Sequence, residues 1–161
     1  MSGNDFQAIG TEEGNDIVAT ESGSGLVVDV VYPNWSLVLR AVIKRLRSDD
    51  DLLAITSGNI RTELPQDAPL PYVRVRLSMG REYDTKDSNG IEHSIVCDVW
   101  SDVDDFQVAD IMQMIYVDLH DRVLTGLVAQ SLKLMLDNMD TFIEGDGSHH
   151  GVVSFSHIVT G

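Results

Sequence analysis

Hydrophobic residues recur with helical spacing in the first part of the chain after residue 34. From near Leu37 to about residue 47, apolar positions repeat every three or four residues, which predicts an amphipathic helix. Three aspartates, residues 49–51, then start a short helical turn that ends at Gly58. We interpret them as charges that stabilise a helix N-terminus rather than as a metal site. The first helix has a basic outer face with the interface candidates Arg40, Lys44 and Arg47.

A strict alternation of apolar and polar positions next predicts a long β-hairpin. Its turn is expected at Ser88, Asn89 and Gly90. A two-residue Asn-Gly loop would place the apolar sets of the two strands on opposite faces, so we expect a three-residue loop or a bulge near Gly80. The apolar sets are Val73, Val75, Leu77 and Met79 in the first strand and Ile91, Ile95, Cys97 and Val99 in the second.

The tip of this hairpin, residues 84–90, carries no apolar side chain. We expect it to project into solvent or toward a partner. Its interface candidates are Asp84, Lys86, Asp87 and Asn89.

A second long helix is predicted to end near Asp121, with capping residues and early negative charge supplied by residues 101–105. Its core stripe is Val108, Ile111, Met112, Ile115 and Leu119. Two residues outside this stripe, Met114 and Val117, are candidates for a second contact surface, although ordinary scatter of apolar residues explains them nearly as well.

Two more strands are predicted, at residues 132–143 and 152–159, with a polar turn at 144–148 between them. The whole pattern predicts an α+β fold. We expect an antiparallel sheet of about four to five strands, with the long hairpin and two main helices packed on one face.

A proline-rich run from Pro65 to Pro71 leads into the first strand of the hairpin. We expect its three prolines to hold the backbone extended and to aim the strand at Tyr72 into the sheet. No side chain in the run suits catalysis, so the run points toward assembly.

Residues 1–34 differ from the rest of the chain in composition. The first 25 residues contain five glycines and no Lys or Arg, so this part cannot bury enough apolar surface to offset the entropy of ordering. The run from Leu26 to Tyr32 is apolar enough to add as a strand to a sheet edge. We therefore expect residues 1–34 to form a flexible or partner-ordered arm and residues 35–161 to form a single domain.

Charge is strongly unbalanced in this chain of 161 residues, which has 26 acidic and 11 basic residues and a net charge of −15. Such a charge disfavours binding to nucleic acid or an anionic membrane. All but two of the basic residues, Arg122 and Lys133, lie between Arg40 and Lys86, so both ends are acidic. This segregation suits a subunit whose acidic surface meets a neighbour's basic surface. An acidic solvated surface is the alternative.

Candidate chemistry is weak throughout. His149 and His150 lie near Glu144 and Asp146, but adjacent residues of a strand point to opposite faces, so we expect a polar turn rather than a metal cluster. The single Cys97 lies in an apolar run and is expected to be buried and inert. No hydrolase, redox or zinc-protease motif occurs. We expect no catalytic, cofactor-binding or metal-binding residues, and no membrane span or signal segment.

The order of these features resembles the tail terminator family of long-tailed bacteriophages and gene transfer agents, also called tail completion or head-tail joining proteins. The resemblance spans about residues 37–159 and leaves residues 1–34 outside. It rests on the order and spacing of several segments: the succession from Leu39 to Leu53, the run Pro65 to Val73, the strand end Val99-Trp100-Ser101, the helix end Leu119-His120-Asp121, and the final strands with the turn at 145–151.

The resemblance implies a structural virion protein rather than an enzyme, made in the host cytoplasm and located at the head-tail junction. Such a subunit would form a homohexameric ring that caps the tail tube protein, stops its polymerisation and meets a head-completion or stopper protein of the neck. DNA would pass through the ring without sequence-specific binding. The alternatives are another neck or tail component, such as a stopper or tube-like adaptor, and a small acidic metal-dependent hydrolase.

Overall fold

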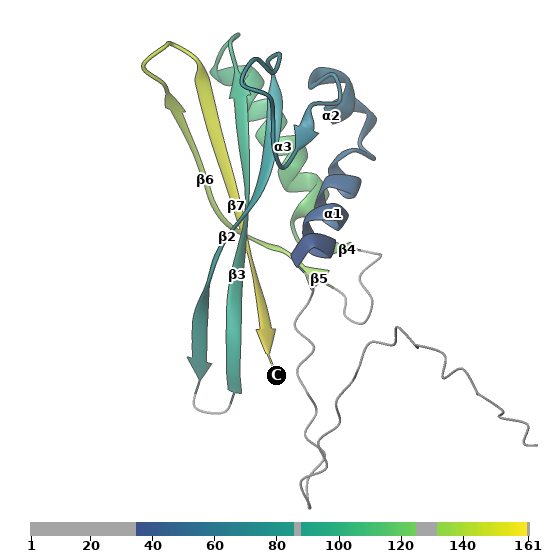
Figure 1. Ribbon diagram of the computed structural model, residues 1–161, viewed down its shortest axis with the longest axis vertical. Coiled ribbons are helices and arrows are strands. Elements are labelled where there is room, and N and C mark those ends of the chain that lie inside the picture. The colour runs from purple at the N-terminus through teal and green to yellow at the C-terminus, as the bar shows by residue number, and fades with distance from the viewer. Residues whose placement is uncertain (1–34, 86–87, 125–131, 161) are drawn as a thin grey trace, which may run out of the picture.

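A computed structural model describes residues 35–85, 88–124 and 132–160 (Figure 1). For residues 79–93, 132 and 158–160 it describes the backbone where it is assigned but not the side chains. The predicted arm, residues 1–34, lies outside the described residues. In chain order the elements are α1 (Trp35–Leu46), α2 (Asp50–Ile55), β1 (Ile60–Arg61), β2 (Tyr72–Thr85), β3 (Ser88–Ser101), α3 (Asp105–Leu119), β4 (Val123–Leu124), β5 (Leu132–Lys133), β6 (Met135–Ile143) and β7 (His149–Thr160).

Five strands form one sheet in the order β1-β2-β3-β7-β6, and α1 and α3 cover one of its faces (Figure 1). This confirms the predicted α+β class. The sheet is antiparallel except at β1, which runs parallel to β2. The sequence pattern missed β1 because two residues are too few to show a period. β4 and β5 form a separate two-stranded ribbon. No helix in the described ranges is long and apolar enough to cross a membrane.

The core lies between the helices and the sheet. The predicted stripe of α3 is confirmed, since all five of its residues are buried. The described apolar positions of the hairpin are buried in the same core: Val73, Val75, Ile95, Cys97 and Val99. Phe155 of β7 is the largest fully buried side chain among the described residues. Cys97 is fully buried, and burial followed by the charge of Asp98 raises the pKa of its thiol to about 12, as expected for an inert cysteine.

Helix ends are capped by aspartates. Asp49 Oδ1 accepts hydrogen bonds from the backbone N–H groups of Asp51 at 2.9 Å and Leu52 at 3.1 Å, which makes Asp49 the N-cap of α2. Asp104 caps α3 in the same way through the N–H of Gln107 at 2.8 Å. The interpretation of residues 49–51 as helix-stabilising charges is therefore confirmed.

The long hairpin is confirmed, but its predicted turn is wrong. β2 and β3 remain paired out to Thr85 and Ser88, so Asn89 and Gly90 lie within β3. Only Lys86 and Asp87, which are outside the described residues, connect the two strands. The predicted turn failed because an Asn-Gly pair also fits inside a strand when the ladder continues past it.

A bulge resolves the mismatch of faces that made a three-residue loop attractive. The register shifts between Ser78 and Arg81, where Met79 and Gly80 of β2 face the single residue His93 of β3. This confirms the alternative of a bulge near Gly80. One extra residue in β2 inverts the alternation of its side chains beyond the bulge, so that residues which would face one side of the sheet face the other. The strands can therefore be joined by a short loop without placing their apolar sets on opposite faces.

The last strands pack closely against α3. β7 begins at His149, earlier than predicted, and a register shift at Asp137 of β6 lets Leu136 and Met139 both pack against the core. Gly151 of β7 lies under α3, where an added Cβ would come within 2.5 Å of Met112 Sδ and Val108 Cγ1. The absence of a side chain at this position therefore sets the distance between helix and sheet.

The proline-rich run is not extended along its whole length. The backbone turns at its start, where the N–H of Ala68 donates to the carbonyl of Pro65 at 3.1 Å. Gln66 and Asp67 lie between the prolines and are free to adopt turn conformations. The run still leads directly into β2 at Tyr72, as predicted.

Candidate functional site

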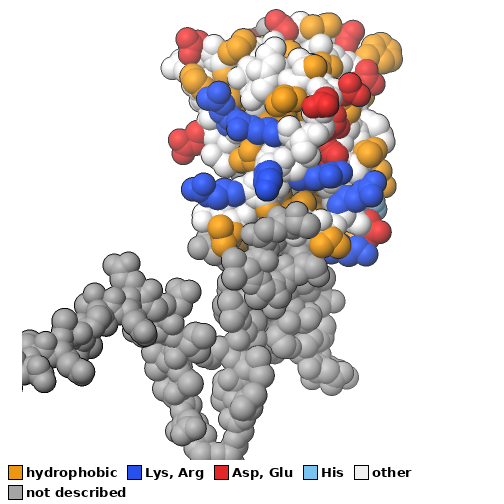
Figure 2. Space-filling view, turned by 90° about the vertical axis from the view of Figure 1, so that its right-hand side faces the viewer, with side chains coloured by type: hydrophobic (Ala, Val, Ile, Leu, Met, Phe, Trp, Pro, Cys, Tyr) orange, Lys and Arg blue, Asp and Glu red, His pale blue; other side chains and the backbone are white. Residues whose placement is uncertain are grey.

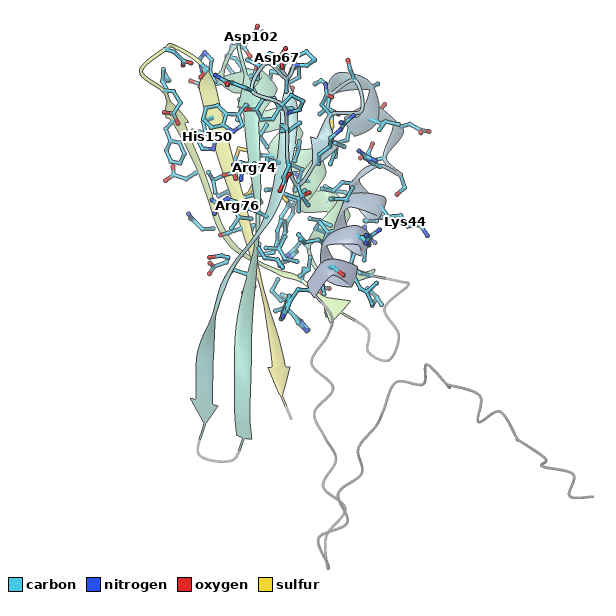
Figure 3. All side chains as sticks on the ribbon, viewed as in Figure 1. Lys44, Asp67, Arg74, Arg76, Asp102 and His150 are labelled. Atoms are coloured by element: carbon cyan, nitrogen blue, oxygen red, sulfur yellow. The ribbon has the colours of Figure 1, made fainter. Side chains whose placement is uncertain are left out.

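The basic face of α1 forms a shallow groove, and the three predicted residues meet there. A depression of about 470 Å³ is lined by Arg40, Ile43, Lys44, Arg47 and Ser48, which we call the basic groove. Figure 2 shows Lys and Arg side chains gathered in bands across the helical side of the molecule, with acidic side chains mainly above them. Lys44 points away from the sheet (Figure 3).

The cations of the basic groove are exposed and have few partners. Arg47 Nε donates to the backbone carbonyl of Ile60 at 3.1 Å. Among the described residues, no carboxylate lies within ion-pair distance of Arg40, Lys44 or Arg47. Neighbouring Arg45 differs, because its Nη2 contacts Asp118 Oδ1 at 3.2 Å. The groove is therefore a positively charged surface available to an acidic group.

A row of rings crosses the uncovered face of the sheet. Tyr72, Trp100, His150 and Phe142 lie directly opposite one another on β2, β3, β7 and β6. His150 stacks on Trp100 with ring centroids 3.9 Å apart and meets Phe142 edge-on at 5.1 Å. Such pairs stabilise a fold by about 0.5–1.5 kcal/mol each beyond simple burial. The row therefore stabilises the packing of the four strands at this end of the sheet.

Charged side chains lie beside the row of rings on the sheet (Figure 3). Arg76 Nε donates to Asp98 Oδ2 at 2.7 Å, and this hydrogen bond raises the pKa of the guanidinium. His150 lies between two carboxylates, with Nε2 3.3 Å from Asp98 Oδ1 and Nδ1 3.0 Å from Glu144 Oε1. In the described part of the chain, no group of three or more His, Cys, Asp or Glu side chains is placed to hold a metal ion.

The two adjacent histidines do point to opposite faces, as expected, but they lie in β7 rather than in a turn. His149 Nδ1 is 2.6 Å from Asp105 Oδ1 at the start of α3. The turn between β6 and β7 ends before His149, earlier than predicted. It is closed by the N–H of Glu144, which donates to the carbonyl of Ser148 at 2.9 Å. The histidines therefore serve two separate contacts.

One end of the molecule exposes large apolar side chains. Ile143 at the end of β6 pairs with His149, whose side chain contacts the first residue of α3, so the two elements are adjacent here. The exposed apolar residues at this end, which we call the apolar end, are Val103 (61% exposed), Phe106 (80%), Phe142 (40%) and Ile143 (65%). Phe142 and Ile143 are neighbours on β6 and therefore point to opposite faces of the sheet. Several large apolar side chains exposed at one end of a molecule are a candidate contact surface. No sequence pattern predicted this surface, although Phe106 lies outside the apolar stripe of α3.

The remaining predicted interface residues are scattered. Asp84 and Asn89 are paired opposite each other near the end of the hairpin, which extends past the helices (Figure 1). Lys86 and Asp87 lie outside the described residues. Met114 is partly buried and packs against the core, whereas Val117 is 51% exposed. Neither Met114 nor Val117 lines the basic groove.

The Arg45–Asp118 pair joins α1 to α3. Asp118 is buried, and this burial, reinforced by the negative charge of Asp49, raises the pKa of its carboxyl despite the nearby Arg45. The folded protein therefore holds a proton on Asp118 more tightly than the unfolded chain does. This carboxyl lowers the stability of the fold as pH rises from 3.8 through its raised pKa.

We expect Asp118→Asn to gain stability relative to the wild type as pH rises from below 3.8 toward neutral. The measurement is the difference in free energy of unfolding by urea at several pH values. Asp121→Asn is the matched control, because the hydrogen bond from Lys133 lowers the pKa of Asp121. That carboxylate stabilises the fold above 3.8 and loses its effect as pH falls, so the control should show the opposite slope. Equal slopes for both variants would contradict the assignment.

Comparison with known proteins identifies the fold and its family. The family model described as "Tail completion protein gp17" matches residues 40–160. The match covers most of the chain and nearly all of the described residues. The chain belongs to the tail completion protein gp17 family. The resemblance predicted from the sequence is therefore confirmed. No curated protein sequence matched this chain in a separate comparison.

A solved structure shares the fold of this tail completion protein. It is a chain of a particle described as "Virion of native gene transfer agent (GTA) particle". The two chains are 20% identical and superpose with a TM-score of 0.67, over 79% of this chain and 97% of the other. As a member of its family, the protein is a structural component of the virion tail or neck.

Proposed function

We propose that this tail completion protein forms a homohexameric ring that caps the finished tail tube, stops its polymerisation and joins the tail to the head. The observation that carries the proposal is the family match over residues 40–160. The tail tube protein and a head-completion or stopper protein of the neck are the partners. Several surfaces that a lone subunit leaves open also support a ring.

Both edges of the sheet offer backbone groups to a neighbour. β1 pairs only with Val73 and Arg74, so the outer edge of β2 beyond Arg74 has no partner strand within the described residues. β6 forms the opposite edge, and it runs antiparallel to β2. Edge-to-edge contact between different strands is a heterologous interface, and such interfaces close into rings when the rotation permits.

Charge supports the same arrangement. The basic groove of one subunit is available to acidic groups, and the chain carries a net charge of −15. Attraction between unlike patches also favours heterologous over two-fold contacts. We propose further that acidic surface lines the channel, so that DNA passes without being held by phosphate contacts. A ring structure with a channel wall of Arg and Lys would overturn this assignment.

The ring needs surfaces toward the tube and the neck as well. We propose that the apolar end, which includes Phe106 and Ile143, makes one of these axial contacts. It lies at the opposite end of the sheet from the hairpin tip (Figure 1). The predicted candidates of that tip, Asp84, Lys86, Asp87 and Asn89, remain proposed for a contact at the other end. Met114 and Val117 remain proposed for a lateral contact.

Electron microscopy of particles made without this protein tests the proposal. We expect tails of uncontrolled length that are not joined to heads, and restoration of normal length when the wild-type gene is supplied. Finished tails of normal length without heads would favour a stopper or another neck component instead. Native mass spectrometry of the purified protein, alone and with tail tubes, should show hexamers. A monomer or dimer whose stability depends on a metal would favour the hydrolase alternative.

A further inference from the structure

The basic groove is built to receive carboxylates that come from elsewhere. Its cations, Arg40, Lys44 and Arg47, surround the partly buried Ile43, and none of the three has a carboxylate partner among the described residues. A suitable occupant therefore carries about three negative charges in a short stretch, together with an aliphatic side chain to cover Ile43.

Residues 1–34 contain such a stretch. This segment has six acidic residues and neither Lys nor Arg. Three of its acids, Glu12, Glu13 and Asp16, fall within five residues and are followed directly by Ile17 and Val18. The family match covers residues 40–160, so this segment lies outside it.

We propose that the stretch from Glu12 to Val18 binds in the basic groove of the same chain. Its three carboxylates pair with Arg40, Lys44 and Arg47, and its aliphatic residues cover Ile43. The contact neutralises the basic face of the free subunit. Any other acidic surface that uses this groove must then compete with it, so the segment regulates access to the groove.

The chain connection favours the same molecule over a second copy. Lys44 follows Trp35 by nine residues, so it lies about 13 Å along the axis of α1 at 1.5 Å per residue. The residues between Asp16 and Trp35 span up to about 60 Å when extended, which is more than enough. A tether of this kind gives an effective concentration on the order of millimolar. A second copy at micromolar concentration must also overcome repulsion between two chains of charge −15.

Carboxyl-to-amine cross-linking tests the contact, because Lys44 is one of three lysines in the chain. The full-length protein is treated with a zero-length carbodiimide at low salt, as an equimolar mixture of unlabelled and ¹⁵N-labelled chains. We expect Lys44 joined to Glu12 or Glu13 within single chains, and about a tenfold loss of this product in half-molar salt, since exposed ion pairs are screened. Products that join labelled to unlabelled chains would assign the contact to a second copy and overturn the proposal.

Two variants with the same change in charge make the test specific. A Glu-specific protease measures how well the segment is protected, through the rate of cleavage after Glu21. In Glu12→Gln/Glu13→Gln/Asp16→Asn we expect this rate to be about tenfold higher than in the wild type, because the segment no longer binds in the groove. Asp5→Asn/Asp29→Asn/Asp67→Asn should leave the rate unchanged, because Asp67 is exposed and far from α1 in the sequence. Arg40→Gln/Arg47→Gln should match the first variant. Equal rates in all four proteins, or equal cross-linking to Lys44 and Lys133, would overturn the proposal. Circular dichroism checks that each variant is folded.

The outcome does not depend on the proposed ring. The contact forms within one free chain, so its failure leaves the capping function untouched. Conversely, a ring that fails to form would not remove the cross-link to Lys44. The two proposals can therefore fail independently.

Discussion

Replacing Phe155 by alanine is expected to lower the free energy of unfolding by about 3–5 kcal/mol. Phe155 is the largest of the fully buried side chains among the described residues, and it lies on β7 between Ile95 of β3 and Leu136 of β6. Alanine removes apolar surface and leaves a cavity that the rigid sheet cannot fill. Since domains of this size are stable by only about 5–15 kcal/mol, the variant should lose a large part of its stability.

Urea denaturation followed by circular dichroism measures this loss. Phe106→Ala is the matched control, because Phe106 is 80% exposed and the same change there should stay within about 0.5 kcal/mol. Phe155→Leu, which keeps most of the volume, provides a folded variant if alanine prevents folding. A cost below about 1 kcal/mol for Phe155→Ala would contradict the position of this side chain at the centre of the core.

Introducing a charge at the apolar end should abolish assembly without unfolding the subunit. For Phe106→Asp/Ile143→Asp we expect at least a 30-fold loss of infectious or gene-transferring particles, since a central contact residue is typically worth about 2 kcal/mol or more. Both side chains are largely exposed, so the free subunit loses little by the change. A desolvated carboxylate in the interface, by contrast, is strongly unfavourable.

The measurement is complementation of a particle that lacks the gene, with urea denaturation to check that the variant is folded. Val123→Asp is the control, because Val123 is 59% exposed but lies on β4, away from the apolar end. Particle yield close to wild type for Phe106→Asp/Ile143→Asp would remove the apolar end from the proposed axial contacts. A similar loss with Val123→Asp would show that added negative charge alone disturbs assembly.

Much of the fold could be predicted because its elements are long and periodic. The stripe of α3 and the alternation in β2 and β3 each extend over several turns or residue pairs, and both are confirmed. Short elements failed for the opposite reason. β1 has two residues, and its parallel pairing with β2 depends on a connection whose course no local pattern specifies.

The candidate surfaces were predictable only where a single helix presents them. Arg40, Lys44 and Arg47 follow helical spacing, so their meeting in the basic groove follows from the sequence. The apolar end is made of residues from α3, β6 and the segment before α3. The row of rings that includes Trp100 and His150 is made of residues from four strands. Neither surface has a signal in any one segment, because its members are brought together only by the order of strands in the sheet.

The sequence by itself determined the α+β class, the two main helices, the hairpin and the membership of a tail assembly family, because these depend on periodicity and on the order of segments. Tertiary structure decided the bulge opposite His93, the approach of α3 to β7 at Gly151, and the contacts that surround His150. Each of these depends on which strand lies beside which. Strand order is set by packing between distant residues, where one register places every side chain on its correct face.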